Sequence, residues 1–316
     1  MTKGLSQRYT TQLSESKKGL LAALSAYLIW ASLSLYWKLL SEVSALEILC
    51  HRILWSFVFI FLYMALSGQL KETLAQYNNK KLIGQLFLSC AVLTFNWFLF
   101  IWAITHNRVI ETSLGYYINP LLNILAGIIF LKEEKSTAIF IAIALATLGV
   151  LVQIVALGTF PFVALGLGIS FCIYGVIRKV ISIESAPGLF IETSLSAPFA
   201  LAYVVYLYMH GQGSFLYTST TIDGLLIFAG VLTSLPLLLF TYGARRITLT
   251  VMGILQYISP TLTFLFGIFL FKETFTVYHL ITFACIWLAL AIYTISSLRQ
   301  TRSAEAIRHK GHQKTC

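Results

Sequence analysis

The chain alternates between long apolar runs and short polar connections along almost its whole length. Ten of the apolar runs are close to the roughly 20 residues that a helix needs to cross a bilayer. They fall at about 20–40, 47–67, 82–104, 112–131, 137–155, 161–178, 189–209, 223–243, 248–271 and 277–298. An isolated strand would leave its backbone polar groups unpaired in lipid, so each run is predicted to be a helix. The pattern therefore predicts an all-α integral membrane protein with ten transmembrane helices.

One apolar segment occurs twice. Residues 117–133 read YINPLLNILAGIIFLKE, and residues 257–273 read YISPTLTFLFGIFLFKE, a constant offset of 140. Each copy carries an internal proline and ends in Lys-Glu. Because five spans per half is an odd number, the two halves are inverted in the membrane. We expect one five-helix repeat at 19–155 and a second at 156–298, between tails at 1–18 and 299–316.

Composition and charge support this assignment and orient the chain. The chain is 58% hydrophobic and 11% charged, about half the charged fraction of a soluble domain. Eighteen of the 22 lysine and arginine residues fall on the side of the two termini, and only Lys38, Arg108 and Lys272 fall in connections on the opposite side. The positive-inside rule therefore places both termini in the cytoplasm. The net charge of +10 indicates contact with the lipid bilayer and its anionic headgroups, not with nucleic acid.

Several common chemistries have no signature in the chain. It has no GxxxxGK[ST] motif for nucleotide binding, no HExxH and no GxSxG, so we expect neither ATP-driven transport nor these hydrolase activities. The histidines show no metal-ligand spacing, and no CxxC pair is present, so we predict no metal site and no cofactor. We expect that the chain is not an enzyme and that any energy comes from an ion or solute gradient.

Several segments resemble one transporter family. The matching segments are SAYLIWASLSLYWKL (25–39), EILCHRILWSF (47–57), NWFLFIWAI (96–104), ETSLGYYINPLLNI (111–124), FCIYGVIRK (171–179), GLFIET (188–193) and QYISPTLTFLFGIFLFKE (256–273). On these segments the chain resembles the drug/metabolite transporter superfamily, with two EamA-type halves, and within it the RarD (chloramphenicol-sensitive protein) subfamily. The resemblance covers roughly residues 17–298. It implies a multi-pass permease of the bacterial inner membrane.

The second span carries the polar residues Glu47, His51 and Arg52. Glu47, His51 and Trp55 are spaced by four residues and share one helix face. At ~1.5 Å per residue, Arg52 lies about 8–9 Å below the outer end of this span. A cation at that depth is costly unless it is paired or hydrated. We interpret Arg52 as an anion-binding or gating residue; the alternatives are that it snorkels to the outer headgroups or only pins neighbouring helices.

Glu192 lies in the seventh span, and subtracting the repeat offset gives position 52. If the offset holds for this span, Glu192 is the repeat counterpart of Arg52, and the two residues belong to opposite ends of the protein. A carboxylate enclosed in the membrane is a candidate proton carrier. The alternative is a carboxylate near a helix start, stabilised by the positive end of the helix dipole.

The prolines suggest where a substrate would bind. Pro120 and Pro260 each remove a backbone hydrogen bond and kink their helices, and in lipid such breaks persist where they are buried or line a cavity. Helix–helix hydrogen bonding is the alternative role for the polar side chains nearby. Asn96 and Trp97 on the third span and Trp30 on the first add amide and aromatic groups. The candidate binding and gating residues are Arg52, His51, Glu47, Trp30, Asn96, Tyr116, Tyr117, Asn119, Asn123, Glu192, Gln256, Tyr257 and Ser259, with Pro120 and Pro260 at the helix breaks.

Together these features predict a secondary-active permease or exporter that moves small amphipathic metabolites or drugs by alternating access. The substrate is expected to be anionic or zwitterionic, and proton coupling through Glu192 is a further hypothesis. A membrane receptor or assembly subunit that binds without transporting is the alternative.

Overall fold

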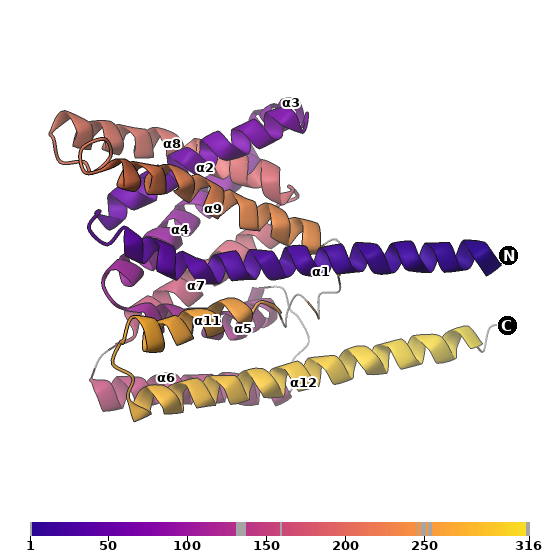
Figure 1. The fold of residues 1–316 in the computed structure, drawn as a ribbon. Helices are drawn as coiled ribbons and strands as arrows, with labels where there is room; N and C mark the ends of the chain where they lie inside the picture. Colours follow the sequence, from indigo (N-terminus) through magenta and orange to yellow (C-terminus); the bar gives the residue numbers. More distant parts are fainter. Residues whose placement is uncertain are drawn as a thin grey trace.

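The computed structural model describes residues 2–130, 137–158, 160–244, 246–247, 251 and 255–313, and their regular structure is helical (Figure 1). The helices are α1 (Thr2–Leu39), α2 (Ala45–Leu66), α3 (Leu70–Ala75), η1 (Gln76–Asn78), α4 (Lys80–Thr105), α5 (Val109–Phe130), α6 (Thr137–Leu157), α7 (Phe162–Val180), α8 (Ser185–Met209), α9 (Thr220–Ala244), α11 (Ile258–Leu265), η2 (Phe266–Leu270) and α12 (Val277–Gln313). Lys132 and Glu133, which end the first copy of the sequence repeat, lie outside the described residues.

Within the described residues, eight helices are long and apolar enough to cross a membrane. They lie in α1, α2, α4, α6, α7, α8, α9 and α12, and each corresponds to one predicted span. The two other predicted spans correspond to α5, of 22 residues, and to the shorter apolar segment Ile258–Leu270. The total of ten spans therefore remains a prediction. The chain turns at Gly158, between α6 and α7, and the φ of 63° at this residue favours glycine.

The ninth predicted span differs from a single kinked helix. Gln256 and Tyr257 form a turn, α11 begins at Ile258, and η2 is a π-helical turn. Pro260 therefore lies in the first turn of α11, where its missing N–H would have no intrahelical acceptor. The helical backbone is thus interrupted just before Pro260, whereas Pro120 lies inside α5.

The internal repeat extends well beyond the duplicated segment. Three pairs of helices begin 140 residues apart: α2 and α8, α4 and α9, and α6 and α12. Contacts between the halves follow the same symmetry. α1 packs on α9, and their repeat counterparts, α7 and α4, also pack on each other. α2 packs on its own counterpart, α8. Such pairing is what a pseudo-two-fold axis between two repeats produces.

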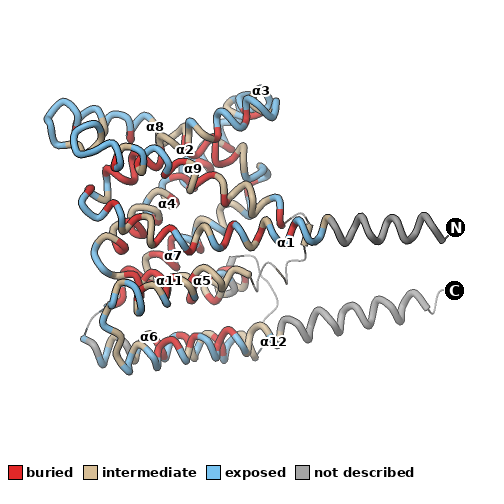
Figure 2. The backbone as a smooth tube through the Cα atoms, in the orientation of Figure 1, coloured by how far each residue is buried: buried red, intermediate tan, exposed pale blue. Residues whose placement is uncertain are grey.

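The core lies between the two halves. α6 packs beside α12 at the lower edge of Figure 1, and α1 and α12 leave the bundle at the same end. Figure 2 shows buried residues concentrated on the helix faces that meet one another, with exposed residues on the outside. The exposed side chains include many large apolar ones, such as Leu62, Phe87 and Phe199. An apolar outer surface of this kind faces lipid.

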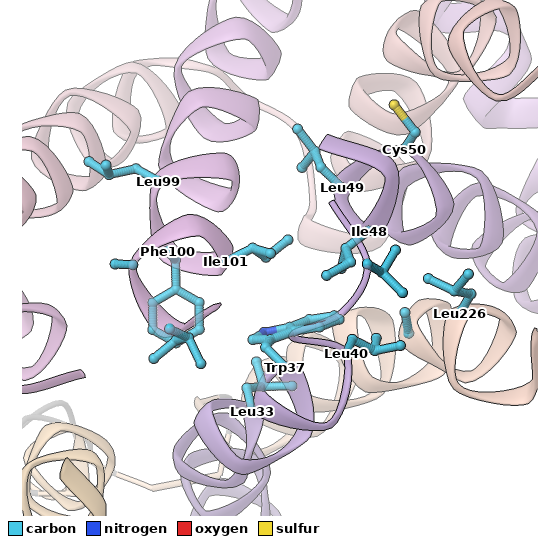
Figure 3. Packing of buried hydrophobic residues seen from close by; sticks show 14 of the residues in the cluster. Leu33, Trp37, Leu40, Ile48, Leu49, Cys50, Leu99, Phe100, Ile101 and Leu226 are labelled. Atoms are coloured by element: carbon cyan, nitrogen blue, oxygen red, sulfur yellow. The ribbon is translucent and has the colours of Figure 1, made fainter. Parts of the chain in front are cut away.

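The largest apolar cluster is centred on α1, α2 and α4. Figure 3 shows Trp37 of α1 among Leu33, Leu40, Ile48 and Ile101. Trp37 is fully buried, so it belongs to the interior and is not a membrane-interface aromatic. Arg52 lies about one turn along α2 from Ile48 and borders this cluster.

Candidate functional site

Arg52 lies where four helices meet. Its side chain leaves α2, and its Nε donates a hydrogen bond to Thr233 Oγ1 of α9 at 2.9 Å. Its guanidinium carbon is 4.2 Å from the ring centroid of Trp97 on α4 and 5.3 Å from that of Trp37 on α1. Arg52 is only 5% exposed. The guanidinium therefore points into the bundle and does not snorkel to the outer headgroups.

The positive charge of Arg52 has no protein counterion in the part of the chain that the structure describes. Its Nη1 is buried and has no hydrogen-bond partner among these residues. Two indole faces compensate part of the lost hydration through cation–π attraction. An unpaired, buried arginine in a membrane bundle is the arrangement that a functional anion site would need.

The surroundings of Arg52 contain further buried polar atoms without partners. Within the described residues these include Trp37 Nε1, both ring nitrogens of His51, and the hydroxyls of Ser56 and Ser234. Most buried polar atoms in folded proteins are hydrogen-bonded. This concentration of unsatisfied groups on α1, α2 and α9 therefore distinguishes the region from ordinary packing.

Glu192 occupies a second buried polar site, on α8. Its Oε1 accepts a hydrogen bond from Ser89 Oγ of α4 at 2.6 Å and lies 3.8 Å from Arg178 Nη1 of α7. Glu192 is the eighth residue of α8, beyond the first turn, where the helix dipole has its effect. The alternative of a carboxylate at a helix start is therefore disfavoured. Arg178 lies in the last turn of α7, and its side chain is only 15% exposed.

Gly188 makes room for the Arg178 side chain. A Cβ atom at Gly188 would lie 2.2 Å from Arg178 Nη1 and 2.4 Å from Nη2. Gly188 precedes Glu192 by one helical turn, so both face α7. The absence of a side chain at this position allows the guanidinium to lie against α8 and approach the carboxylate.

The two charged sites occupy equivalent positions of the repeat. α2 begins at Ala45 and α8 at Ser185, so the offset of 140 holds for this helix pair. Arg52 and Glu192 are therefore counterparts of opposite charge. They do not pair with each other: Arg52 bonds to α9, and Glu192 bonds to α4.

The candidate asparagines bond to neighbouring helices. Asn96 Nδ2 donates to Leu167 O at 3.0 Å and to Ser170 Oγ at 2.9 Å, both on α7. Asn119 Nδ2 donates to Gly168 O of α7 at 3.2 Å, and Asn123 Nδ2 donates to Asn119 Oδ1 at 2.9 Å. These contacts pin α7 to α4 and α5. A contact of Asn96, Asn119 or Asn123 with substrate remains a prediction.

The duplicated segments meet at the centre of the two-fold arrangement. Tyr117 and its counterpart Tyr257 stack with their ring centroids 6.3 Å apart. The Tyr117 hydroxyl is 2.5 Å from Thr261 Oγ1, and Ser113 Oγ donates to Pro260 O at 2.7 Å. The carbonyl of Pro260 is thus satisfied by the other half, as buried backbone in a membrane requires.

The remaining candidates lie around this centre. The Tyr116 ring packs on that of Phe100, with the ring centroids 5.8 Å apart. Trp30 packs on Phe240 of α9 at 5.6 Å. Gln256 and Ser259, at the start of the α11 region, are half-buried. Their roles in binding remain predictions.

The polar residues Glu47, His51, Arg108 and Glu111 form separate groups and not one cluster. Glu47 Oε1 accepts backbone N–H bonds from Ser214 at 2.6 Å and from Phe215 at 3.2 Å, and thereby holds the loop between α8 and α9. His51 packs on the ring of Phe215 at 4.6 Å. Arg108 pairs with Glu111 at 3.1 Å in the same helical turn.

Glu273, in the connection between η2 and α12, links the two halves. Its two carboxylate oxygens accept the backbone N–H groups of Val109 and Ile110 at 2.6 and 2.8 Å, and so cap the first turn of α5. Burial raises the pKa of Glu273 above its ordinary value, while these two hydrogen bonds and Lys38 act in the opposite direction. The preceding residue, Lys272, has a φ of 52°, an unfavourable conformation for a residue with a Cβ.

Some of these residues were not among the sequence candidates. Thr233, Ser89 and Arg178 contact the two charged residues, and Gly188 makes room for one of the contacts. A hydroxyl within an apolar span is a weak signal, because it often bonds to its own helix. The pairing of these residues depends on which helices become neighbours, and a single sequence does not give that.

The fold and the buried polar groups define an integral membrane transporter built from two repeats. Residues 17–155 and 160–295 each match the EamA-like transporter family. The chain belongs to this family, and within the drug/metabolite transporter superfamily it is a RarD-type permease. It is therefore a multi-pass protein of the bacterial inner membrane, in contact with the lipid bilayer, and a transporter, not an enzyme.

Named relatives match almost the whole chain. The uncharacterized transporter YojE of Bacillus subtilis is 42% identical over 299 residues, which cover 93% of this chain and 99% of the relative. Protein RarD of Escherichia coli is 40% identical, covering 91% and 97%. The chloramphenicol-sensitive protein RarD of Pseudomonas aeruginosa is 29% identical, also covering 91% and 97%. One crystal structure shares the fold, with a TM-score of 0.54 at 15% identity, covering 88% of this chain and 98% of the other.

Proposed function

We propose that this protein is a secondary-active transporter that moves small amphipathic metabolites or drugs across the inner membrane by alternating access. In this proposal the first repeat comprises residues 19–155 and the second comprises residues 156–298, and the tails are residues 1–18 and 299–316. The observation that supports this proposal is the symmetric packing of the two halves. α1 of the first half packs on α9 of the second, and the equivalent pair α7 and α4 also packs across the halves.

This arrangement provides a physical route to two states. Two inverted halves with similar folds can exchange their conformations, so a site between them opens first to one side and then to the other. The α1–α9 and α7–α4 interfaces would be the surfaces that rearrange. Because the packing of helices is bistable and not continuously deformable, small local changes at the site can favour one state.

We infer that both termini are cytoplasmic. α1 and α12 leave the bundle at the same end (Figure 1). From the sequence, most lysine and arginine residues outside the spans belong to the tails and connections on that side, and the positive-inside rule assigns that side to the cytoplasm. A protease-cleavable tag at either terminus should be cut in inverted membrane vesicles and protected in right-side-out vesicles. The reverse protection pattern would contradict the assigned orientation.

We further propose that Glu192 couples transport to protons. Glu192 is buried and one of its oxygens, Oε2, has no hydrogen-bond partner among the described residues. Arg178 is near enough to stabilise the ionised form, so movement of α7 relative to α8 would change the proton affinity of Glu192. Transport by Glu192→Gln under an imposed pH gradient should lose its pH dependence. An unchanged dependence would exclude this role.

The transport proposal is tested in liposomes. Purified protein is reconstituted into vesicles loaded with a mixture of metabolites and drugs, and the loss of each solute is followed by mass spectrometry against protein-free vesicles. A carrier should also be accelerated by excess of the same solute on the opposite side. If solutes bind but none crosses, the protein is a receptor or an assembly subunit, and the proposed function is wrong.

A further inference from the structure

We propose that Arg52 and Trp37 bind the carboxylate of an organic anion with an aromatic body, and that such an anion is the preferred substrate class. This inference rests on the proposed transport function, because both side chains are enclosed in the present conformation. Trp37 is fully buried and Arg52 is 5% exposed. A ligand reaches them only after the two halves have moved.

The chemistry of the two unsatisfied atoms selects the ligand. Arg52 Nη1 and Trp37 Nε1 both lack a hydrogen-bond partner within the described residues. A guanidinium and an indole N–H can only donate. The guanidinium carbon lies 5.3 Å from the centroid of the Trp37 ring, so both donors belong to one neighbourhood. A carboxylate offers two acceptor oxygens and a negative charge, and it would satisfy both donors.

The surrounding side chains indicate the rest of the ligand. The Arg52 guanidinium lies over Trp97 at 4.2 Å, and Phe100 and Tyr116 form an aromatic pair on the adjoining faces of α4 and α5. Aromatic side chains next to a few directional polar groups are typical of sites for planar apolar molecules.

The site discriminates between an anion and a zwitterion. No carboxylate of the described residues pairs with Arg52. Glu47 bonds to the loop between α8 and α9, and Glu192 bonds to Ser89 near Arg178. An α-ammonium group would therefore lose its hydration without gaining a counterion. A simple aryl carboxylate is favoured over the corresponding amino acid.

The location of the site links binding to movement. Arg52 and both tryptophans belong to the first half, whereas Thr233, which accepts the Arg52 Nε hydrogen bond, belongs to the second half. A carboxylate held at Nη1 would be bound to the same guanidinium whose Nε contacts Thr233. Occupancy would therefore act on a side chain that joins the two halves, which couples binding to the α2–α9 interface.

The test compares three probes with the same aromatic body. Binding of 3-phenylpropionate, 3-phenylpropanamide and phenylalanine to the purified full-length protein is measured by calorimetry and by ligand-induced thermal stabilisation. We expect 3-phenylpropionate to bind at least about 10-fold more tightly than the other two, since a hydrogen bond to a charged group is stronger than one between neutral groups. Equal affinity for the amide would overturn the carboxylate assignment.

Variants then assign the donors. Arg52→Gln should abolish 3-phenylpropionate binding, and Arg52→Lys should weaken it strongly, because an ammonium does not reproduce the planar guanidinium that lies against the two indole rings. Trp37→Phe keeps an aromatic ring but removes Nε1, and should weaken binding about 3–10-fold. Arg108→Gln removes an outer arginine paired with Glu111 and is the matched control, with unchanged binding. Undiminished binding by folded, monodisperse Arg52→Gln and Arg52→Lys would refute the site.

Transport measurements separate this inference from the proposed function. If other solutes cross the membrane in liposomes but 3-phenylpropionate neither binds nor crosses, the carboxylate site is wrong and the transport function stands. If 3-phenylpropionate binds through Arg52 and no solute crosses, the transport function is wrong, and so is the assignment of this anion class as substrate.

Discussion

The close contact between α2 and α9 can be tested with one methyl group. A Cβ atom at Gly230 of α9 would lie 2.3 Å from the backbone carbon of Trp55, 2.4 Å from its oxygen and 2.6 Å from its Cβ. Backbone atoms cannot rotate away, so Gly230→Ala must push the two helices apart. Overpacking of this kind costs about 1–3 kcal/mol, which exceeds the gain in helix propensity of up to about 1 kcal/mol.

The same helix supplies a matched control. A Cβ atom at Gly224 would have open space around it, with no atom of a neighbouring element within 4 Å, so Gly224→Ala should be neutral or slightly stabilising. The unfolding free energy of both variants is measured by titrating dodecyl sulfate into detergent micelles. Gly230 precedes Thr233 by about one turn, so separation of α2 and α9 should also lengthen the Arg52–Thr233 contact and alter 3-phenylpropionate binding.

The outcome decides between two descriptions of the interface. A loss of stability in Gly230→Ala, with none in Gly224→Ala, agrees with backbone contact between α2 and α9. Equal stability of the two variants would show that these helices are not in contact at Gly230. In that case the placement of Arg52 against Thr233, which depends on the same interface, would also be refuted.

Three further predictions concern single contacts. Gly188→Ala should displace the flexible Arg178 side chain from Glu192 without loss of stability and shift the pH profile of transport in liposomes; an identical profile would contradict the pairing. Asn96→Ala should cost about 1–2 kcal/mol of unfolding free energy through lost hydrogen bonds to α7, measured by the same titration, and a cost near zero would exclude the pinning role. The pKa of Glu273 is higher in the folded protein than in the unfolded chain, so protonation of Glu273 favours the folded state. This contribution to the unfolding free energy is present at low pH and is lost as pH rises through the folded pKa. Unfolding free energies of Glu273→Gln should therefore vary less with pH above 4.5 than those of the wild type, and matching curves would contradict the assignment.

The candidate site was only partly predictable from the sequence. Arg52 and Glu192 are conspicuous as charges within apolar runs, and their equivalence follows from the offset of 140. Arg178 was not a sequence candidate, because a cation at the end of a span gives no sign of a buried partner. Its partner Glu192 is fourteen positions later in the chain, on the adjacent helix α8. The sequence also does not show that the missing side chain of Gly188 makes room for the Arg178 guanidinium.

The amino-acid sequence by itself determined the class of protein. The length and spacing of apolar runs are sufficient to identify membrane helices. In lipid, each such run must pair its own backbone N–H and C=O groups, and a helix does so. The repeated segment further predicted a two-repeat layout. These features depend on local composition and periodicity, which can be read along the chain.

Only the tertiary structure decided how the helices pair and what each buried polar group contacts. Arg52 meets Thr233, 181 residues away, and Glu192 meets Ser89, 103 residues away. The break before Pro260 likewise became a turn followed by α11, with the Pro260 carbonyl satisfied by Ser113 of the other half. In a membrane, where every buried polar group needs a partner, helix packing determines which partner is within reach.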